Sequence, residues 1–336
     1  MFYERVGKDA VCRLCRRFCR IPPGGTGFCR VRKNESGRLE VLNYGRVAAA
    51  SVDPVEKKPF FHFAPGSLAF SICSVGCNFS CGYCCNWHLS REWTDFGEEM
   101  SPEDVVNAAL SSGSQGISYT YTEPTVFFEF ASDCAKLARR SGLYNTFVTN
   151  GYASEEVASA ASRFLDAAVI DFKAAADPEF YRKHAGVRGA EEIFRTLEVL
   201  FERGVFLEVT NLVIPGLGDD RRRFEAFCKR ISDISPEIPL HVLRYFPSYR
   251  FSLPPTPEKT VLKFVEIARK AGLKYVYPGN LPSGLDTLCE CGRVLIRRAG
   301  LPAVSVELKC PECGFEPPVK GRRWIPKNLL KVGGIK

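Results

Sequence analysis

Length, composition and charge set the first limits on what this chain is. It has 336 residues, of which 45% are hydrophobic and 25% are charged, and its net charge is +8. These values are typical of a globular protein with a large core. No apolar run approaches the ~20 residues that a membrane-spanning helix needs. The first residues also lack the pattern of a secretory signal, so we expect a cytoplasmic protein that does not contact membranes.

The cysteines indicate metal binding rather than disulfide bonds. The chain has 15 of them, and an odd number without an export signal argues against a disulfide framework. Eleven fall into three tight groups, which are typical of metal ligands. The groups are Cys12, Cys15, Cys19 and Cys29; Cys77, Cys81 and Cys84; and Cys289, Cys291, Cys310 and Cys313.

The positive charge lies with the two terminal cysteine groups. Residues 1–46 carry +7 and residues 286–336 carry +5, so the stretch between them carries −4. One interpretation is that the chain binds nucleic acid or another anionic partner. We favour the alternative that arginines such as Arg16 and Arg17 offset the negative charge of metal-bound thiolates, because no basic repeat interleaved with aromatic residues is present.

Three regions of the chain differ in residue composition and pattern, and we expect them to be three structural units. They are a Cys-rich N-terminal module over residues 1–66, a catalytic core over 67–285, and a C-terminal module with a basic tail over 286–336. Within the core, six apolar segments rich in β-branched or aromatic residues predict buried parallel strands. These segments are 68–74, 116–121, 144–149, 167–173, 205–213 and 240–246, and a short seventh is expected at 275–277.

Helix signals lie between the predicted strands. Ser101 and Ser154 are each followed by acidic residues typical of a first helical turn, and Asp219-Asp220 precedes a helical stretch through Phe227. The alternation predicts an α/β fold with a parallel sheet and right-handed crossovers. We expect a partial (β/α)6 barrel, whose functional residues follow the carboxyl ends of its strands.

The central cysteine group directly follows the first predicted core strand. Cys77, Cys81 and Cys84 are spaced by three residues and then by two. Three thiolates without a close fourth suit a [4Fe-4S] cubane that leaves one iron open. A structural zinc site would recruit a fourth ligand, and Cys73 and Cys85 are poorly placed to supply it.

This loop resembles that of the radical S-adenosylmethionine (SAM) superfamily. The resemblance includes the C-x3-C-x2-C spacing, the aromatic Tyr83 before the last cysteine, and the segment 119–124 after the second strand. It extends from about Cys12 to about Cys313 and is nearest to the pyruvate formate-lyase-activating enzymes. Within that group the chain is most similar to the radical SAM protein of the AmmeMemoRadiSam system. Cys85 stands where that subfamily commonly has Gln.

The resemblance implies a cofactor and a reaction. A [4Fe-4S] cluster on the three cysteines would bind SAM and cleave it reductively to a 5′-deoxyadenosyl radical, which abstracts hydrogen from a substrate. Glu123 would accept hydrogen bonds from the amino group of SAM. Further cofactor contacts are expected from strand-end residues, and no catalytic residue is assigned. These contact residues are Tyr83, Thr122, Asn150, Asp171 and Lys173. In isolation, Asn150 is also an ordinary turn residue, and Asp171 and Lys173 could form a plain ion pair.

The two terminal cysteine groups predict separate metal sites. The C-terminal group, with its Cys-Pro-x-Cys-Gly motif beside a predicted hairpin over 294–308, is similar to half a zinc ribbon, so zinc is expected there. The N-terminal group suits either zinc or an auxiliary iron–sulfur cluster. Such metals would replace a core that short segments cannot build.

Two functions from different classes therefore follow from the sequence. The first is a radical SAM oxidoreductase that acts on a protein or peptide and takes electrons from a donor such as ferredoxin or flavodoxin. The second is a zinc-dependent nucleic-acid-binding protein without radical chemistry. The spacing of the central cysteines and the position of Glu123 favour the first.

Overall fold

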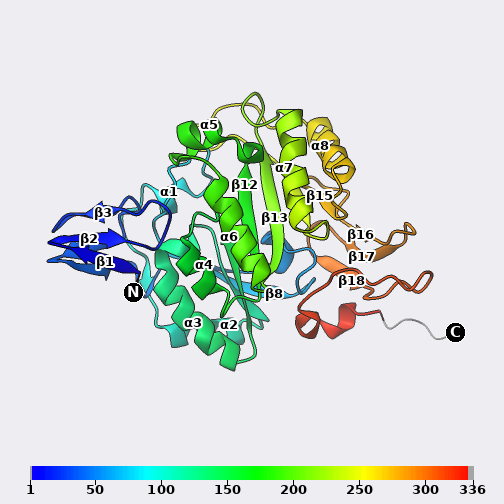
Figure 1. The fold of residues 1–336 in the computed structure, drawn as a ribbon. Helices are drawn as coiled ribbons and strands as arrows, with labels where there is room; N and C mark the ends of the chain where they lie inside the picture. Colours follow the sequence, from blue (N-terminus) through cyan, green and yellow to red (C-terminus); the bar gives the residue numbers. More distant parts are fainter. Residues whose placement is uncertain (1, 332–336) are drawn as a thin grey trace.

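The structure is a computed structural model that describes residues 2–331. Its centre is an eight-stranded sheet in which seven neighbouring strands are parallel and the last is antiparallel (Figure 1). In spatial order the strands are β15 (Val276–Gly279), β14 (Leu240–Arg244), β13 (Phe206–Val213), β12 (Ala167–Lys173), β11 (Tyr144–Thr149), β10 (Gly116–Tyr119), β8 (Leu68–Cys73) and β7 (Ala49–Pro54).

The parallel strands confirm the predicted α/β fold. All six predicted strands and the short seventh are present, and β11 and β12 have the predicted bounds. The side chains of Val169, Ile170 and Phe172 on β12 are fully buried, as expected for a strand covered on both faces. The sequence did not indicate β7, which pairs antiparallel with β8.

Helices connect the parallel strands, and several of them lie side by side on the face of the sheet nearest the viewer in Figure 1. The helix α2 has both halves of a capping box, because Ser101 Oγ accepts from the Asp104 N–H at 3.1 Å and Asp104 accepts from the Ser101 N–H at 2.8 Å. The helices are α1 (Trp87–Ser90), α2 (Pro102–Ser111), α3 (Phe128–Arg140), α4 (Glu155–Ala161), α5 (Pro178–Phe180), α6 (Glu191–Glu202), α7 (Arg221–Ile234) and α8 (Glu258–Lys270).

The terminal segments form small sheets at opposite ends of the molecule (Figure 1). The N-terminal segment supplies one three-stranded and one two-stranded antiparallel sheet. Its strand β6 (Arg46–Val47) pairs with β9 (Glu98–Glu99). The C-terminal segment supplies another three-stranded sheet, which contains the predicted hairpin. The strands are β1 (Tyr3–Val6), β2 (Asp9–Cys12), β3 (Arg20–Ile21), β4 (Arg32–Glu35), β5 (Arg38–Val41), β6 (Arg46–Val47), β9 (Glu98–Glu99), β16 (Thr287–Leu288), β17 (Val294–Arg298) and β18 (Ala303–Val306).

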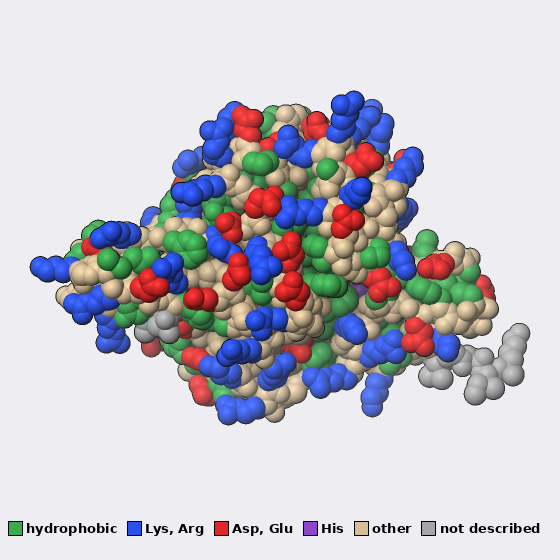
Figure 2. Space-filling view, viewed as in Figure 1, with side chains coloured by type: hydrophobic (Ala, Val, Ile, Leu, Met, Phe, Trp, Pro, Cys, Tyr) green, Lys and Arg blue, Asp and Glu red, His purple; other side chains and the backbone are tan. Residues whose placement is uncertain are grey.

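No helix in residues 2–331 combines the length and the apolar character that crossing a membrane requires. Figure 2 shows Lys and Arg side chains interspersed with Asp and Glu on the visible face of the protein, rather than gathered in one patch.

Candidate functional site

The loop with the central cysteines lies past the carboxyl end of β8, and two distant segments hold it in place. The Ser80 N–H donates to Ala185 O at 2.9 Å, and the Gly82 N–H donates to His184 O at 3.1 Å. On its other side, Gly82 O accepts from the Arg250 N–H at 2.9 Å. The loop is therefore fixed by the segments that follow β12 and β14.

All three cysteines of this loop are partly buried, and the protein surroundings of Cys77 and Cys81 disfavour their thiolate forms. Burial raises the pKa of Cys77 well above its usual value, and burial raises the pKa of Cys81 to about 12. The Phe79 N–H donates to Cys77 Sγ at 3.3 Å, a contact that favours the thiolate. A thiolate ligand forms when a metal displaces the proton, so the donor set fits an iron–sulfur cluster with three protein ligands.

Glu123 lies at the start of a short 3-10 turn after β10, and its carboxylate is fully enclosed. Oε1 accepts from the Thr125 N–H at 3.0 Å, from Thr125 Oγ1 at 2.6 Å and from Thr149 Oγ1 at 2.7 Å. Oε2 accepts from the Asn150 N–H at 2.8 Å. Burial raises the pKa of Glu123, against the lowering effect of these hydrogen bonds. Its carboxylate also contributes to the raised pKa of Cys77.

Asn150 connects Glu123 to the cysteine loop. Its backbone N–H contacts the Glu123 carboxylate, and its Nδ2 donates to Asn78 Oδ1 at 2.7 Å and lies 3.9 Å from Cys77 Sγ. The following Gly151 has φ +70°, and a Cβ there would come within 2.7 Å of Ile193. The turn after β11 is thus tightly constrained and brings Asn150 to the cysteines.

The other predicted contact residues surround the loop in different ways. Tyr83 packs against Phe180 and Phe251 with ring centroids 5.3 and 5.5 Å away. Its buried hydroxyl has no hydrogen-bond partner among the described residues, although the charge of Cys81 contributes to its raised pKa. Thr122 instead donates to Ser74 O at 2.6 Å, so its hydroxyl ties the segment after β10 to the residue that follows β8.

Asp171 and Lys173 form an ion pair at the carboxyl end of β12. Lys173 Nζ lies 2.5 Å from Asp171 Oδ2, and Thr210 Oγ1 donates to the other carboxylate oxygen. The positive charge of Lys173 opposes the rise in the pKa of Cys81. The pair therefore lies on the Cys81 side of the loop, and Glu123 lies on the Cys77 side.

The C-terminal cysteines come together in one compact group. The sulfurs of Cys289 and Cys313 are 3.3 Å apart, those of Cys291 and Cys310 are 3.7 Å apart, and all four lie within 4.8 Å of one another. Ligands that share one tetrahedral zinc ion at ~2.3 Å stand about 3.8 Å apart. This group can therefore hold a single metal ion.

The sequence did not reveal the residues that hold the predicted ones. Thr125 and Thr149 bind the Glu123 carboxylate, Asn78 joins Cys77 to Asn150, and Thr210 supports Asp171. Asn78 is next to Cys77 in the sequence, and Thr149 precedes Asn150. Adjacency to predicted site residues was the available signal.

Comparison with known proteins now gives the class. The sequence signature described as the radical SAM superfamily matches residues 71–231, which contain all three central cysteines and extend from within β8 to beyond β13. The chain belongs to the radical SAM superfamily and resembles its pyruvate formate-lyase-activating members.

Three individual proteins show how far the similarity extends. An uncharacterized protein from Methanocaldococcus jannaschii is 40% identical over 94% of this chain and 97% of its own. A pyruvate formate-lyase-activating enzyme from Clostridium pasteurianum is 23% identical over 51% of this chain and 72% of its own. The solved structure of Streptococcus suis SuiB bound to S-adenosylmethionine has a TM-score of 0.51 at 14% identity, over 65% of this chain and 52% of that chain. That last likeness concerns the fold alone.

Proposed function

We propose that Cys77, Cys81 and Cys84 hold the [4Fe-4S] cluster that membership of the superfamily implies, with one iron open to SAM. The observation that supports this most directly is the loop itself, with three partly buried cysteines and with Glu123 and Asn150 beside Cys77. When bound, the cluster and SAM together supply reductive cleavage of the sulfonium and a carbon radical that abstracts hydrogen.

The residues of the chain position the cofactor and exclude water. Glu123 Oε2 accepts only from the Asn150 N–H within the described chain, so it retains a lone pair for the amino group of SAM. Asn150, Tyr83 and the Asp171–Lys173 pair complete the surroundings of the loop. Thr122 contributes by fixing the backbone next to Glu123.

The proposed substrate is a protein or peptide. Support comes from the resemblance to an activating enzyme, whose name describes action on another enzyme, and from the uneven charge of the chain. A low-potential one-electron donor such as ferredoxin or flavodoxin would reduce the cluster. Membership of the radical SAM superfamily counts against the alternative of a nucleic-acid-binding protein without radical chemistry.

The C-terminal group is proposed to bind one zinc ion. Four sulfurs within 4.8 Å match the donor set of a structural zinc site. The group also lies beside a buried polar network, in which Arg298 donates to Phe61 O at 2.6 Å and Tyr277 contacts both His62 and Thr287. The metal would therefore stabilise a module that is anchored to the sheet.

Deuterium transfer tests the proposed hydrogen abstraction and the substrate class together. The reconstituted protein is incubated with SAM, dithionite and an extract of source cells grown in deuterated medium, after the extract has been separated into macromolecules and small molecules. We expect deuterium in the 5′-deoxyadenosine product with the macromolecular fraction. Deuterium with the small-molecule fraction alone would contradict a protein or peptide substrate, and none with either would contradict hydrogen abstraction.

A further inference from the structure

The N-terminal cysteines converge on one small cavity. Cys12 ends β2, Cys15 and Cys19 lie in the loop before β3, and Cys29 lies just before β4. All four line the same cavity, together with Arg17, Arg32, Asn78 and Val126. Cys12 and Cys29, which are 17 residues apart in the sequence, thus face the same site.

The spacing of these sulfurs differs from that of the C-terminal group. Within the described part of the chain, Cys289, Cys291, Cys310 and Cys313 form the one group of potential ligands with all ligand atoms inside 4.8 Å. The N-terminal four line a cavity but do not form such a compact group, and neither do the three central cysteines, which the superfamily assigns to a cubane. A [4Fe-4S] cluster binds each thiolate through a different iron, so its ligands stand further apart than ligands that share one ion.

Two arginines supply the charge that such a cluster needs. Arg32 is buried and forms an ion pair with Glu129 at 2.6 Å, while its charge acts on both Cys12 and Cys29. Arg17 lies over the ring of Phe28 at 3.4 Å and borders the cavity. Four thiolates and the iron–sulfide core are anionic together, and buried cations offset that charge.

The N-terminal module also contacts the loop with the central cysteines directly. Arg17 donates to Asn78 O and to Gly186 O, each at 2.5 Å. Asn78 follows Cys77 in the chain, and its Nδ2 lies 3.4 Å from Tyr152 O. The same residue therefore borders the N-terminal cavity and adjoins a central cysteine.

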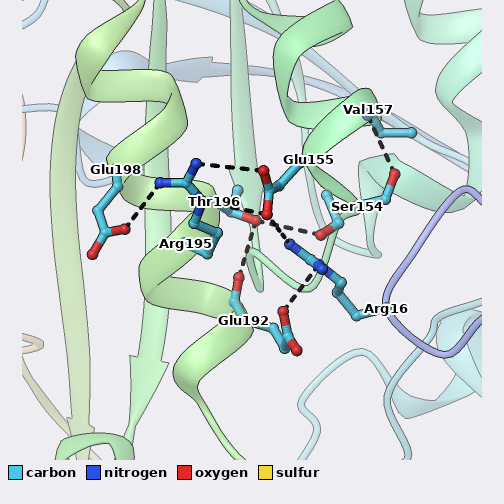
Figure 3. Close-up of polar contacts among 9 residues, drawn as sticks. Arg16, Ser154, Glu155, Val157, Glu192, Arg195, Thr196 and Glu198 are labelled. Atoms are coloured by element: carbon cyan, nitrogen blue, oxygen red, sulfur yellow. Dashed lines mark hydrogen bonds and ion pairs between the residues drawn. The ribbon is translucent and has the colours of Figure 1, made fainter.

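Figure 3 shows the second part of this docking contact. Arg16 extends from the N-terminal loop between α4 and α6, and it lies 2.9 Å from Glu155 and 3.0 Å from Glu192. Arg195 on α6 also contacts Glu155, at 3.3 Å. Beside them, the backbones of Cys15 and Ala153 form an isolated antiparallel β-bridge. These contacts hold the N-terminal cysteines against the turn that contains Asn150.

We propose that Cys12, Cys15, Cys19 and Cys29 hold a second iron–sulfur cluster, adjacent to the central one and distinct from the zinc site at the other end of the chain. The inference concerns which metal the module binds and does not rest on the substrate or on hydrogen abstraction.

Metal analysis of a chain without the central cluster tests the proposal. We would purify and reconstitute, without oxygen, a variant in which Cys77, Cys81 and Cys84 are all alanine. We expect it to retain iron with an equal amount of acid-labile sulfide, and about one zinc ion per chain. Further replacement of Cys12 and Cys29 by alanine should remove the remaining iron and leave the zinc. The matched controls Cys134→Ala and Cys228→Ala, in buried positions of α3 and α7, should not change the iron content.

The opposite result is about two zinc ions and no iron in the triple variant, which would overturn the proposal. If a variant does not fold, the unmodified chain still decides. About eight iron ions and one zinc ion per chain support a second cubane, whereas about four iron ions and two zinc ions contradict it. Absence of SAM cleavage by the unmodified chain, with iron retained at the N-terminal site of the triple variant, would count against the proposed function alone.

Discussion

Several hydrogen bonds within the chain fix the side chain of Glu123 without any bound ligand. Its carboxylate accepts hydrogen bonds from Thr125, Thr149 and the backbone of Asn150. One acidic side chain thereby joins the end of β10 to the end of β11 and sets the position of Asn150 beside Cys77. We therefore expect Glu123 both to bind SAM and to order the site before SAM arrives.

Replacement of Glu123 by Gln tests this role. A charge-assisted hydrogen bond contributes roughly 1.5–3 kcal/mol, so the dissociation constant for SAM should rise by about one to two orders of magnitude. Binding would be measured by equilibrium dialysis on the reconstituted protein, and its iron content should not change. Glu208→Gln is the matched control, because Glu208 is equally buried but accepts from His62 and His241 near the start of β13. Equal SAM affinity in the Glu123 variant and the unmodified chain would contradict the assignment.

Site residues that belong to a motif could be predicted from the sequence. The residues that form hydrogen bonds to them could not. Glu123 and Asn150 follow apolar strands, so their position at one edge of the sheet could be predicted. Thr125 and Thr149 are ordinary neighbours in the sequence. Their hydroxyls become important because β10 and β11 are adjacent, and only the folded chain shows that adjacency in detail.

At the scale of elements, burial explains which predictions succeeded. The bounds of β11 and β12 were predicted because their segments are buried almost throughout. Between β10 and β11, a 3-10 turn over Pro124–Phe127 precedes α3, and the Glu123 side chain caps this turn at the Thr125 N–H. The short strands of the N-terminal segment have two to six residues each and lie in a stretch rich in Cys, Arg, Gly and Pro, without the apolar runs that identified the core strands.

The ion pair between Arg32 and Glu129 joins β4 to α3 and should stabilise the N-terminal module. Arg32 Nη1 and Nη2 contact both carboxylate oxygens, and Nη2 also donates to Val126 O at 3.0 Å. Loss of one partner of a buried pair leaves the other partner without compensation. Arg32→Met should therefore lower the free energy of unfolding by about 3 kcal/mol in denaturant titrations.

The exposed pair of Arg13 with Glu4 provides the control for this measurement. Arg13→Met should leave the unfolding midpoint unchanged, because water already screens that pair. Equal effects of the two substitutions would mean that the Arg32–Glu129 pair does not anchor the module.

At the scale of the whole molecule, the cysteines form three groups in different parts of the fold. The central group lies at the carboxyl ends of the parallel strands, and the terminal modules lie at opposite ends of the molecule (Figure 1). The parallel core and the three cysteine groups could be predicted from spacing. The docking of the N-terminal module on the catalytic loop could not, because it depends on contacts such as Arg17 with Asn78 between segments 61 residues apart.

Removal of the C-terminal metal should affect one module and leave the catalytic site in place. Replacement of Cys310 and Cys313 by Ser should abolish binding of about one zinc ion per chain. Limited proteolysis should then cut within residues 287–313 while SAM cleavage continues, because the module is distant from the central loop. Protection from protease in the zinc-free variant would show that the metal does not stabilise this segment.

The central claim is that Cys77, Cys81 and Cys84 bind the cluster that cleaves SAM. Its most direct test is the formation of 5′-deoxyadenosine from SAM and dithionite under anaerobic conditions, compared between the reconstituted chain and the variant with all three cysteines changed to alanine. We predict formation of 5′-deoxyadenosine by the unmodified chain and none above background by the variant. 5′-Deoxyadenosine from the variant at the rate of the unmodified chain would contradict the claim.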